Sequence, residues 1–130
     1  MQDVEVQEWL RGYLNAFAAA ARDRIAGAKL RLEFYGVPLI PSTSAGLQSF
    51  TTHEQVVEFV NALVKGLPQE YSHTDLLQSE LIRVNDGAVV WRTEFSRRAK
   101  DGHEIERSGG TYFIVNGDFG PRICVIGVHS

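Results

Sequence analysis

The sequence predicts an α+β fold in which a curved antiparallel sheet packs on about three N-terminal helices. Helical patterns fill the first half of the chain, and residues 71–129 read as four β-rich runs separated by turn signals at 85–87, 101–102 and 116–120. A meander that follows helices must fold over them as one layer. We therefore expect one domain over residues 1–130, with a pocket between sheet and helices.

The first helix is predicted over residues 4–22, because large apolar side chains recur at three- and four-residue steps. Residues 25–35 fit two alternatives, since 30–34 alternates like a strand while its apolar residues also suit a short helix. Gly36 and Pro38 then interrupt whichever of the two forms. The apolar stripe of the first helix consists of Val6, Trp9, Leu10, Tyr13, Leu14 and Phe17.

A small hairpin is predicted over residues 37–51, with Gly46 supplying the positive φ angle that its turn needs. The clearest helix start of the chain follows, because Thr51 and Glu54 have the spacing of a capping box. An apolar face continues behind this cap, and Gly66 marks the end of the helix.

The register of the central hairpin follows from its turn. If residues 101–102 form a two-residue turn, Arg97 lies opposite Glu106 and Trp91 lies opposite Tyr112. The first pair is ionic and the second is aromatic, and both are favourable across neighbouring strands. Two independent pairs therefore support the same register.

This register divides the hairpin into two faces. The more apolar face is expected to look toward the helices, and it carries Val89, Trp91, Thr93, Phe95, Ser108, Gly110, Tyr112 and Ile114. The opposite face mixes charged, polar and apolar side chains, and we expect it to contact a second copy of the chain in a C2 homodimer. It carries Val90, Arg92, Glu94, Ser96, Arg107, Gly109, Thr111 and Phe113.

Composition argues against several classes of function. The net charge is −3 and the basic residues are scattered, so no nucleic-acid partner is expected. No apolar stretch is long enough to span a membrane, and the first residues lack a signal core, so neither a membrane partner nor export is expected.

The single cysteine, Cys124, forms no internal disulfide, which favours a cytoplasmic location. The four histidines lack metal-ligand spacing, and no metal or other cofactor is expected.

Four segments carry a family resemblance. They are residues 13–17 (YLNAF), 34–39 (FYGVPL), 51–57 (TTHEQVV) and 101–107 (DGHEIER), the last leading to Tyr112. In this order they resemble the cone-shaped nuclear-transport-factor-2-like fold, which ketosteroid isomerases and SnoaL-like polyketide cyclases share. The resemblance covers nearly the whole chain and implies a cone-shaped form of the fold predicted above. Its motifs mark positions in the fold, so it implies no particular reaction.

The ketosteroid isomerases of this fold use a general-base carboxylate, a protonated carboxyl group and a tyrosine on the first helix. Tyr13 matches that tyrosine. The position of the base falls near Thr43, and residues 34–53 contain no Asp or Glu. The second carboxyl position falls near Thr111, and no acid lies between Arg107 and Gly117. Steroid-isomerase chemistry is therefore not expected, and no residue is assigned a catalytic role.

The leading hypothesis is an uncharacterised protein with a pocket for a small apolar organic ligand, and an isomerase-, cyclase- or hydrolase-type activity stays open. The alternatives are a non-enzymatic dimerisation or protein-association module, and a ligand carrier. The aromatic candidates also suit ordinary core packing, which is the commoner role of such residues. The candidates for the pocket wall are Tyr13, Phe17, Phe34, Trp91, Phe95, Tyr112 and His129.

Overall fold

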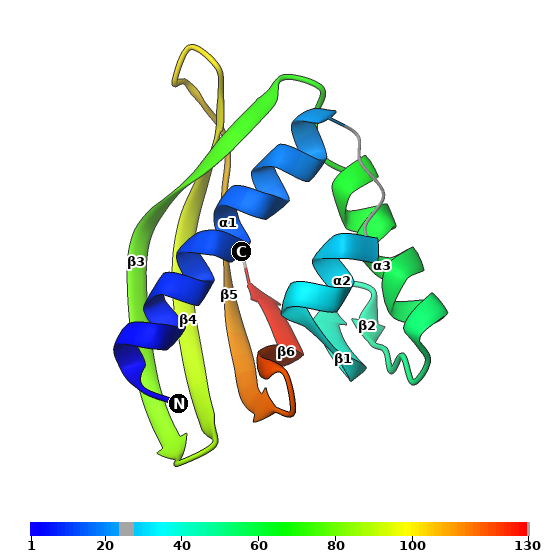
Figure 1. The fold of residues 1–130 in the computed structure, drawn as a ribbon. Coiled ribbons are helices and arrows are strands. Elements are labelled where there is room, and N and C mark those ends of the chain that lie inside the picture. Colours follow the sequence, from blue (N-terminus) through cyan, green and yellow to red (C-terminus); the bar gives the residue numbers. More distant parts are fainter. Residues whose placement is uncertain (24–27, 130) are drawn as a thin grey trace.

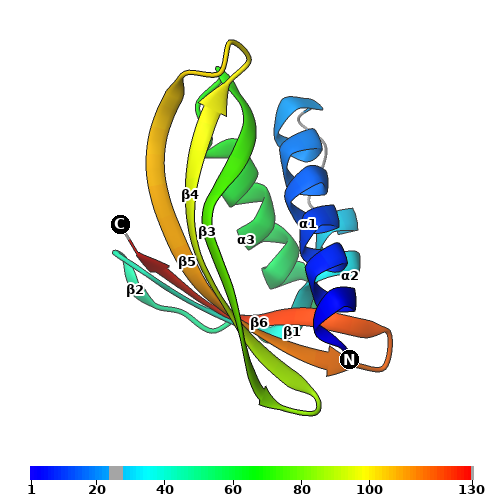
Figure 2. The ribbon, with the colours of Figure 1, turned by 90° about the vertical axis from the view of Figure 1, so that its left-hand side faces the viewer.

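The computed structural model describes residues 1–23 and 28–129, in which three helices pack on one side of a curved six-stranded sheet (Figures 1 and 2). This arrangement confirms the predicted α+β fold. The helices are α1 (Asp3–Asp23), α2 (Ala28–Phe34) and α3 (His53–Lys65). The strands are β1 (Tyr35–Thr43), β2 (Gly46–Leu47), β3 (Tyr71–Asn85), β4 (Ala88–Ala99), β5 (Glu104–Gly117) and β6 (Gly120–His129).

The sheet is mixed and does not close, with the strand order β2-β1-β6-β5-β4-β3. Strands β3 to β6 form the expected antiparallel meander, but β1 pairs in parallel with β6. The expectation of a purely antiparallel sheet is therefore wrong at this one junction. Parallel neighbours are joined by long crossovers and never by tight turns, so no local sequence signal marks this pairing.

Residues 25–35, which fitted either a helix or a strand, include the end of a helix and the start of a strand. Helix α2 ends at Phe34 and strand β1 begins at Tyr35, while residues 25–27 lie outside the described part of the chain. Leu30 and Phe34 are the buried residues of α2. They are four residues apart, which puts them on one face of a helix. A strand would place Leu32 on the same face as these two residues, but Leu32 is 58% exposed, so only the helix fits the burial.

Helix α3 is capped one residue later than predicted. Thr52 is the N-cap, and its hydroxyl accepts a hydrogen bond of 3.2 Å from the backbone N–H of Gln55. The side chain of Gln55 accepts in return from the backbone N–H groups of Thr51 and Thr52, at 2.8 and 3.3 Å. Thr52 and Gln55 have the same spacing as the predicted pair Thr51 and Glu54. The pair that forms the box also satisfies an extra N–H, that of Thr51.

The central hairpin has the predicted register over most of its length. Trp91 lies opposite Tyr112 with ring centroids 5.0 Å apart, and Arg97 lies opposite Glu106 in an ion pair of 2.6 Å. A bulge after Arg97 shifts the register only next to the turn. The predicted division into an inner and an outer face therefore holds.

The inner face of the sheet and the helices share one hydrophobic core. Val6, Leu10 and Tyr13 on α1 are buried, as the apolar stripe predicted. Trp91 is 2% exposed, and its indole N–H donates to the Ser79 hydroxyl on β3 at 2.9 Å. The polar end of this large ring is thus satisfied at the edge of the core, by an exposed serine. Within residues 1–23 and 28–129, no helix is long and apolar enough to cross a membrane.

Replacing the N-cap tests the position of the α3 capping box. We expect Thr52→Ala to lower the free energy of unfolding by about 1 kcal/mol, because the N–H of Gln55 loses its acceptor. Thr51→Ala serves as the matched control and should have a smaller effect, since only the backbone of Thr51 takes part in the box. Urea denaturation of the three proteins measures the difference. A larger loss for Thr51→Ala would contradict the cap assignment.

Candidate ligand-binding site

A cavity of about 290 Å³ lies between the inner face of the sheet and helices α1 and α3. Its wall includes the exposed residues Ala62, Gly66 and Val128, so the cavity reaches the surface there. The volume is close to the lower end of the roughly 300–1,000 Å³ typical of ligand pockets. It is also about twice the roughly 150 Å³ of a cavity that holds benzene. The apolar part of the wall is formed by Leu14, Phe17, Phe59, Leu63, Leu67, Phe95 and Ile126.

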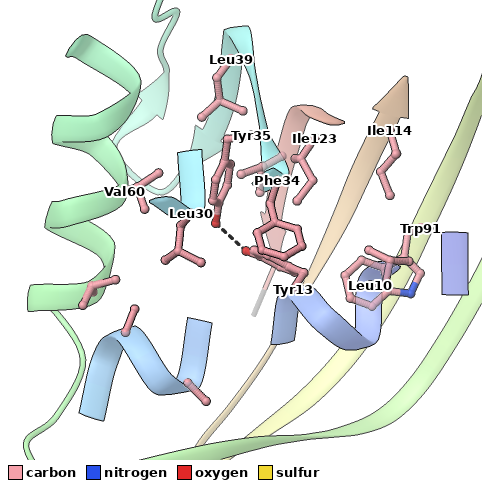
Figure 3. Packing of buried hydrophobic residues seen from close by; sticks show 14 of the residues in the cluster. Leu10, Tyr13, Leu30, Phe34, Tyr35, Leu39, Val60, Trp91, Ile114 and Ile123 are labelled. Atoms are coloured by element: carbon pink, nitrogen blue, oxygen red, sulfur yellow. Dashed lines mark hydrogen bonds between the residues drawn. The ribbon is translucent and has the colours of Figure 1, made fainter. Parts of the chain in front are cut away.

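Two tyrosine hydroxyls meet in the wall of this cavity (Figure 3). Tyr13 comes from α1 and Tyr35 is the first residue of β1, and their hydroxyl oxygens are 2.5 Å apart. The two rings pack edge to face with centroids 5.7 Å apart. Two hydroxyls carry two protons, and the bond between them uses one. Among the described residues neither hydroxyl has another partner, so one O–H remains to donate to a ligand.

A third tyrosine, Tyr112 on β5, owes its position to a glycine. A Cβ atom at Gly110 would lie 2.8 Å from the Tyr112 ring and 3.1 Å from its hydroxyl oxygen, so the ring occupies the space that any other residue would fill. The ring therefore lies along the strand and forms part of the cavity wall. Its hydroxyl has no hydrogen-bond partner within the described part of the chain.

Burial keeps the three tyrosines of the cavity protonated. It raises the pKa of Tyr112 to about 12 and raises the pKa values of Tyr13 and Tyr35 as well. The neighbouring tyrosines Tyr35 and Tyr112 add to the rise of the Tyr13 pKa. All three side chains are consequently neutral hydroxyl donors near neutral pH.

Arg97 is the charged residue of the cavity wall. Its guanidinium lies 5.2 Å from the centroid of the Phe95 ring, and one of its nitrogens is 2.6 Å from a carboxylate oxygen of Glu106. Its positive charge lowers the pKa values of Tyr13 and Tyr112 and so opposes part of the effect of burial. The guanidinium and the three tyrosines thus border the same cavity.

The sequence matches the model of the NTF2-like protein family DUF6841 over residues 3–130. The chain belongs to this family. Its fold agrees with that match, because the helices cover one side of a curved sheet and enclose a cavity. A comparison of this DUF6841 protein with curated protein sequences gives no match.

Solved structures share the fold of this DUF6841 protein at low sequence identity. A protein of unknown function with a cystatin-like fold from Nostoc punctiforme superposes with a TM-score of 0.73 at 5% identity, covering 98% of this chain and 92% of that chain. A protein of unknown function of the DUF3225 family from Pectobacterium atrosepticum gives a TM-score of 0.68 at 16% identity, covering 97% and 88%. An uncharacterised protein with a cystatin-like fold from Caulobacter vibrioides gives 0.64 at 14% identity, covering 96% and 89%. These likenesses establish the fold alone.

The residues expected in the pocket wall of the DUF6841 protein occupy three different places. Tyr13, Phe17, Phe95 and Tyr112 line the cavity together. Phe34 lies behind the wall against the Tyr13 ring, with centroids 5.4 Å apart, and Trp91 packs on Tyr112 in the core. His129 is not among the residues that line this cavity.

Sequence reasoning missed Tyr35 and Arg97 as members of the wall. Tyr35 lies in residues 25–35, which the sequence did not assign to a helix or a strand. The direction of its side chain follows only from the change of helix to strand at that residue. The sequence does contain a signal that places Arg97 in the wall. Arg97 is two residues after Phe95 on the same strand, and side chains two residues apart point to the same face.

The positions that hold carboxylates in the isomerases are different here. Thr43 lies in the cavity wall, whereas Thr111 lies on the outer face, where its hydroxyl is 3.4 Å from His129. The described residues of the wall include no Asp or Glu. The described ranges also contain no group of three or more His, Cys, Asp or Glu side chains that could hold a metal ion.

His129 lies over a second glycine on the outer face of the sheet. A Cβ atom at Gly109 would come within 2.6 Å of the imidazole ring, so this glycine makes room for it. The ring borders a wide polar depression of about 930 Å³, which also includes Glu80, Arg92 and Glu94. The depression is on the opposite side of the sheet from the tyrosines, so His129 belongs to a separate surface.

The protonated state of the tyrosines can be tested by titration. The chain has four tyrosines, and burial raises the pKa of each, including Tyr71. A tyrosine ionises near pH 10 in an unfolded chain, so the folded state holds protons that the unfolded state releases. We expect the contribution of the tyrosines to stability to be fully present below about pH 10, and the free energy of unfolding to fall as the pH rises further.

Tyrosinate absorbance of the folded protein should appear only above about pH 10, whereas the urea-unfolded chain should titrate near that value. A tyrosinate signal in the folded protein by about pH 9 would show that one of these hydroxyls ionises more easily than its burial allows.

Proposed function

We propose that this protein binds a small, largely apolar organic molecule in the cavity between α1, α3 and the sheet. The Tyr13–Tyr35 pair carries the proposal, because it presents an uncommitted hydroxyl proton in an otherwise mostly apolar wall. A few placed polar groups in an apolar cavity are the usual composition of a ligand site. The volume of about 290 Å³ suits a molecule with one or two rings.

Binding without turnover fits this cavity better than an isomerase-, cyclase- or hydrolase-type reaction. Such reactions need a group that takes up a proton or attacks the substrate. The tyrosines of the wall are neutral donors, and its described residues include no carboxylate, imidazole or thiol. We therefore favour the role of a ligand carrier or sensor over that of an enzyme.

The role of the tyrosine pair is tested by comparing Tyr35→Phe with Tyr71→Phe. Both residues are buried strand tyrosines whose hydroxyls make a hydrogen bond, but the hydroxyl of Tyr71 bonds to Thr74 and Tyr71 does not line the cavity. We expect Tyr35→Phe to weaken ligand binding by roughly fivefold, because a neutral hydrogen bond contributes about 1 kcal/mol. Tyr71→Phe should weaken binding less than Tyr35→Phe does, because it leaves the Tyr13–Tyr35 pair intact and reaches the wall only through Thr74.

Native mass spectrometry of freshly purified protein can detect a co-purified ligand. Such a ligand adds mass to the protein and dissociates at higher collision energy. The ligand identified in this way is then titrated into the unchanged protein and into both variants. Equal binding by Tyr35→Phe and the unchanged protein would remove the tyrosine pair from the site. Absence of any adduct, together with no binding of one- and two-ring probes, would contradict the proposed function itself.

We also propose that two copies of the chain associate through the outer face of the sheet. A row of apolar side chains crosses five strands there, each residue opposite the next, and Ile82 and Val125 in this row are 44% and 36% exposed. A contiguous apolar surface of this kind is typical of an interaction site. The row consists of Ile82, Val90, Phe113, Val125 and Ile40.

Charges beside this apolar row suit a second copy of the same chain. Glu80 lies opposite Arg92, and Glu94 is 3.8 Å from Arg107. A two-fold rotation brings a face that carries both signs onto itself, so basic groups of one copy can meet acidic groups of the other. We further propose a cytoplasmic location, because Cys124 is the single cysteine of the chain and forms no internal disulfide.

Light scattering tests the dimer. We expect a mass of twice the chain mass of 14.5 kDa. Ile82→Glu should reduce this to a single chain, since it places a charge in the apolar row. Leu47→Glu is the matched control, because Leu47 is a 74% exposed apolar residue outside the row. A monomer mass for the unchanged protein would refute the association.

A further inference from the structure

The polar side chains of the cavity wall can all donate hydrogen bonds. Its charged member is a guanidinium, and its hydroxyls come from tyrosine, threonine and serine side chains. Carboxylates, which only accept hydrogen bonds, are missing from the described wall. A ligand group that presents only acceptors and a negative charge would satisfy these donors best. The wall has donor groups on Tyr13, Tyr35, Thr43, Thr74, Arg97, Ser108 and Tyr112. The hydroxyl of Ser108 already donates to the backbone carbonyl of His129, and that of Thr74 is bonded to the Tyr71 hydroxyl.

Arg97 has donors to spare for such a group. A guanidinium has five N–H bonds, and the pair with Glu106 engages one nitrogen at 2.6 Å. The Phe95 ring supports the guanidinium at 5.2 Å. The fork geometry of arginine matches the two oxygens of a carboxylate better than a single carbonyl oxygen.

Glu106 is the natural competitor of an incoming acid. It lies opposite Arg97 on β5, and its side chain is 46% exposed against 27% for that of Arg97. The glutamate can therefore turn into solvent at little cost while the arginine stays beside the cavity. Exposed ion pairs of this kind are weak, so a carboxylate held also by buried hydroxyls can displace it.

We propose that the ligand is a one- or two-ring carboxylic acid, bound as its carboxylate by Arg97 and by the hydroxyls of the Tyr13–Tyr35 pair and Tyr112. This inference rests on the proposed function, since it names the class of molecule that the same cavity takes. The rings lie against the apolar wall, and the acid group replaces Glu106 at the guanidinium.

Calorimetric titration with matched probe pairs tests the inference. The probes are 2-naphthoate with 2-naphthamide, and benzoate with benzamide, because each amide keeps the shape of its acid without the charge. The unchanged protein should bind the acid at least roughly tenfold more tightly than the amide, since hydrogen bonds between charged groups are the stronger ones. Arg97→Met should lose roughly tenfold to a hundredfold in acid binding and leave amide binding unchanged.

Two further variants separate charge from folding. Glu106→Gln removes the competitor and should tighten acid binding by roughly twofold to fivefold, the scale of an exposed ion pair. Arg97→Lys keeps the charge but not the fork, so its affinity for the acid should lie between those of Arg97→Met and the unchanged protein. Circular dichroism of each variant confirms that it is folded.

The outcomes distinguish this inference from the proposed function. Equal binding of acid and amide, or an equal loss of both in Arg97→Met, overturns the carboxylate assignment and leaves the ligand site standing. Weaker acid binding by Glu106→Gln also overturns it, because the glutamate would then assist the ligand. Failure of all four probes, with no adduct in native mass spectrometry, counts against the cavity as a ligand site altogether.

Discussion

The hydrogen bond between Tyr13 and Tyr35 ties the first helix to the first strand inside the core. Both rings are buried, so each hydroxyl has lost water and depends on the other for its hydrogen bond. Their edge-to-face packing fixes the angle at which α1 meets β1. That angle also decides how far the helix stands from Tyr112 and Phe95 on the sheet. A contact between two residues 22 positions apart thus joins α1 to β1 in the wall of the cavity.

The glycines at 109 and 110 place two rings on opposite sides of one strand. The missing side chain of Gly110 accommodates Tyr112 on the inner face, and that of Gly109 accommodates His129 on the outer face. The hydroxyl of Thr93 bonds both backbone polar groups of Gly110, which holds the strand at this point. A short stretch without side chains therefore shapes both the candidate ligand site and the surface proposed for association.

The local parts of the fold could be predicted from the sequence, and the non-local parts could not. The turn at 101–102 and the pair of Trp91 with Tyr112 gave the register because both signals lie within one hairpin. The parallel pairing of β1 with β6 has no such signal. Of the candidate site, the aromatic wall followed from the inner face of that hairpin. Tyr35 depends on where a helix changes into a strand, and the four-residue spacing of Leu30 and Phe34 fits both elements, so it does not mark that boundary.

The parallel pairing of β1 with β6 has a consequence for the order of folding. Tyr35 pairs with Ile123, so β1 finds its place in the sheet only after nearly the whole described chain has been synthesised. Contacts between such distant residues form slowly, because a long loop must close before they are gained. During synthesis, α1, α2 and the hairpin of β1 and β2 emerge before β6, which is the parallel partner of β1. The last strand is therefore the element that completes the tyrosine pair's surroundings, and the cavity is among the final features of the molecule to form.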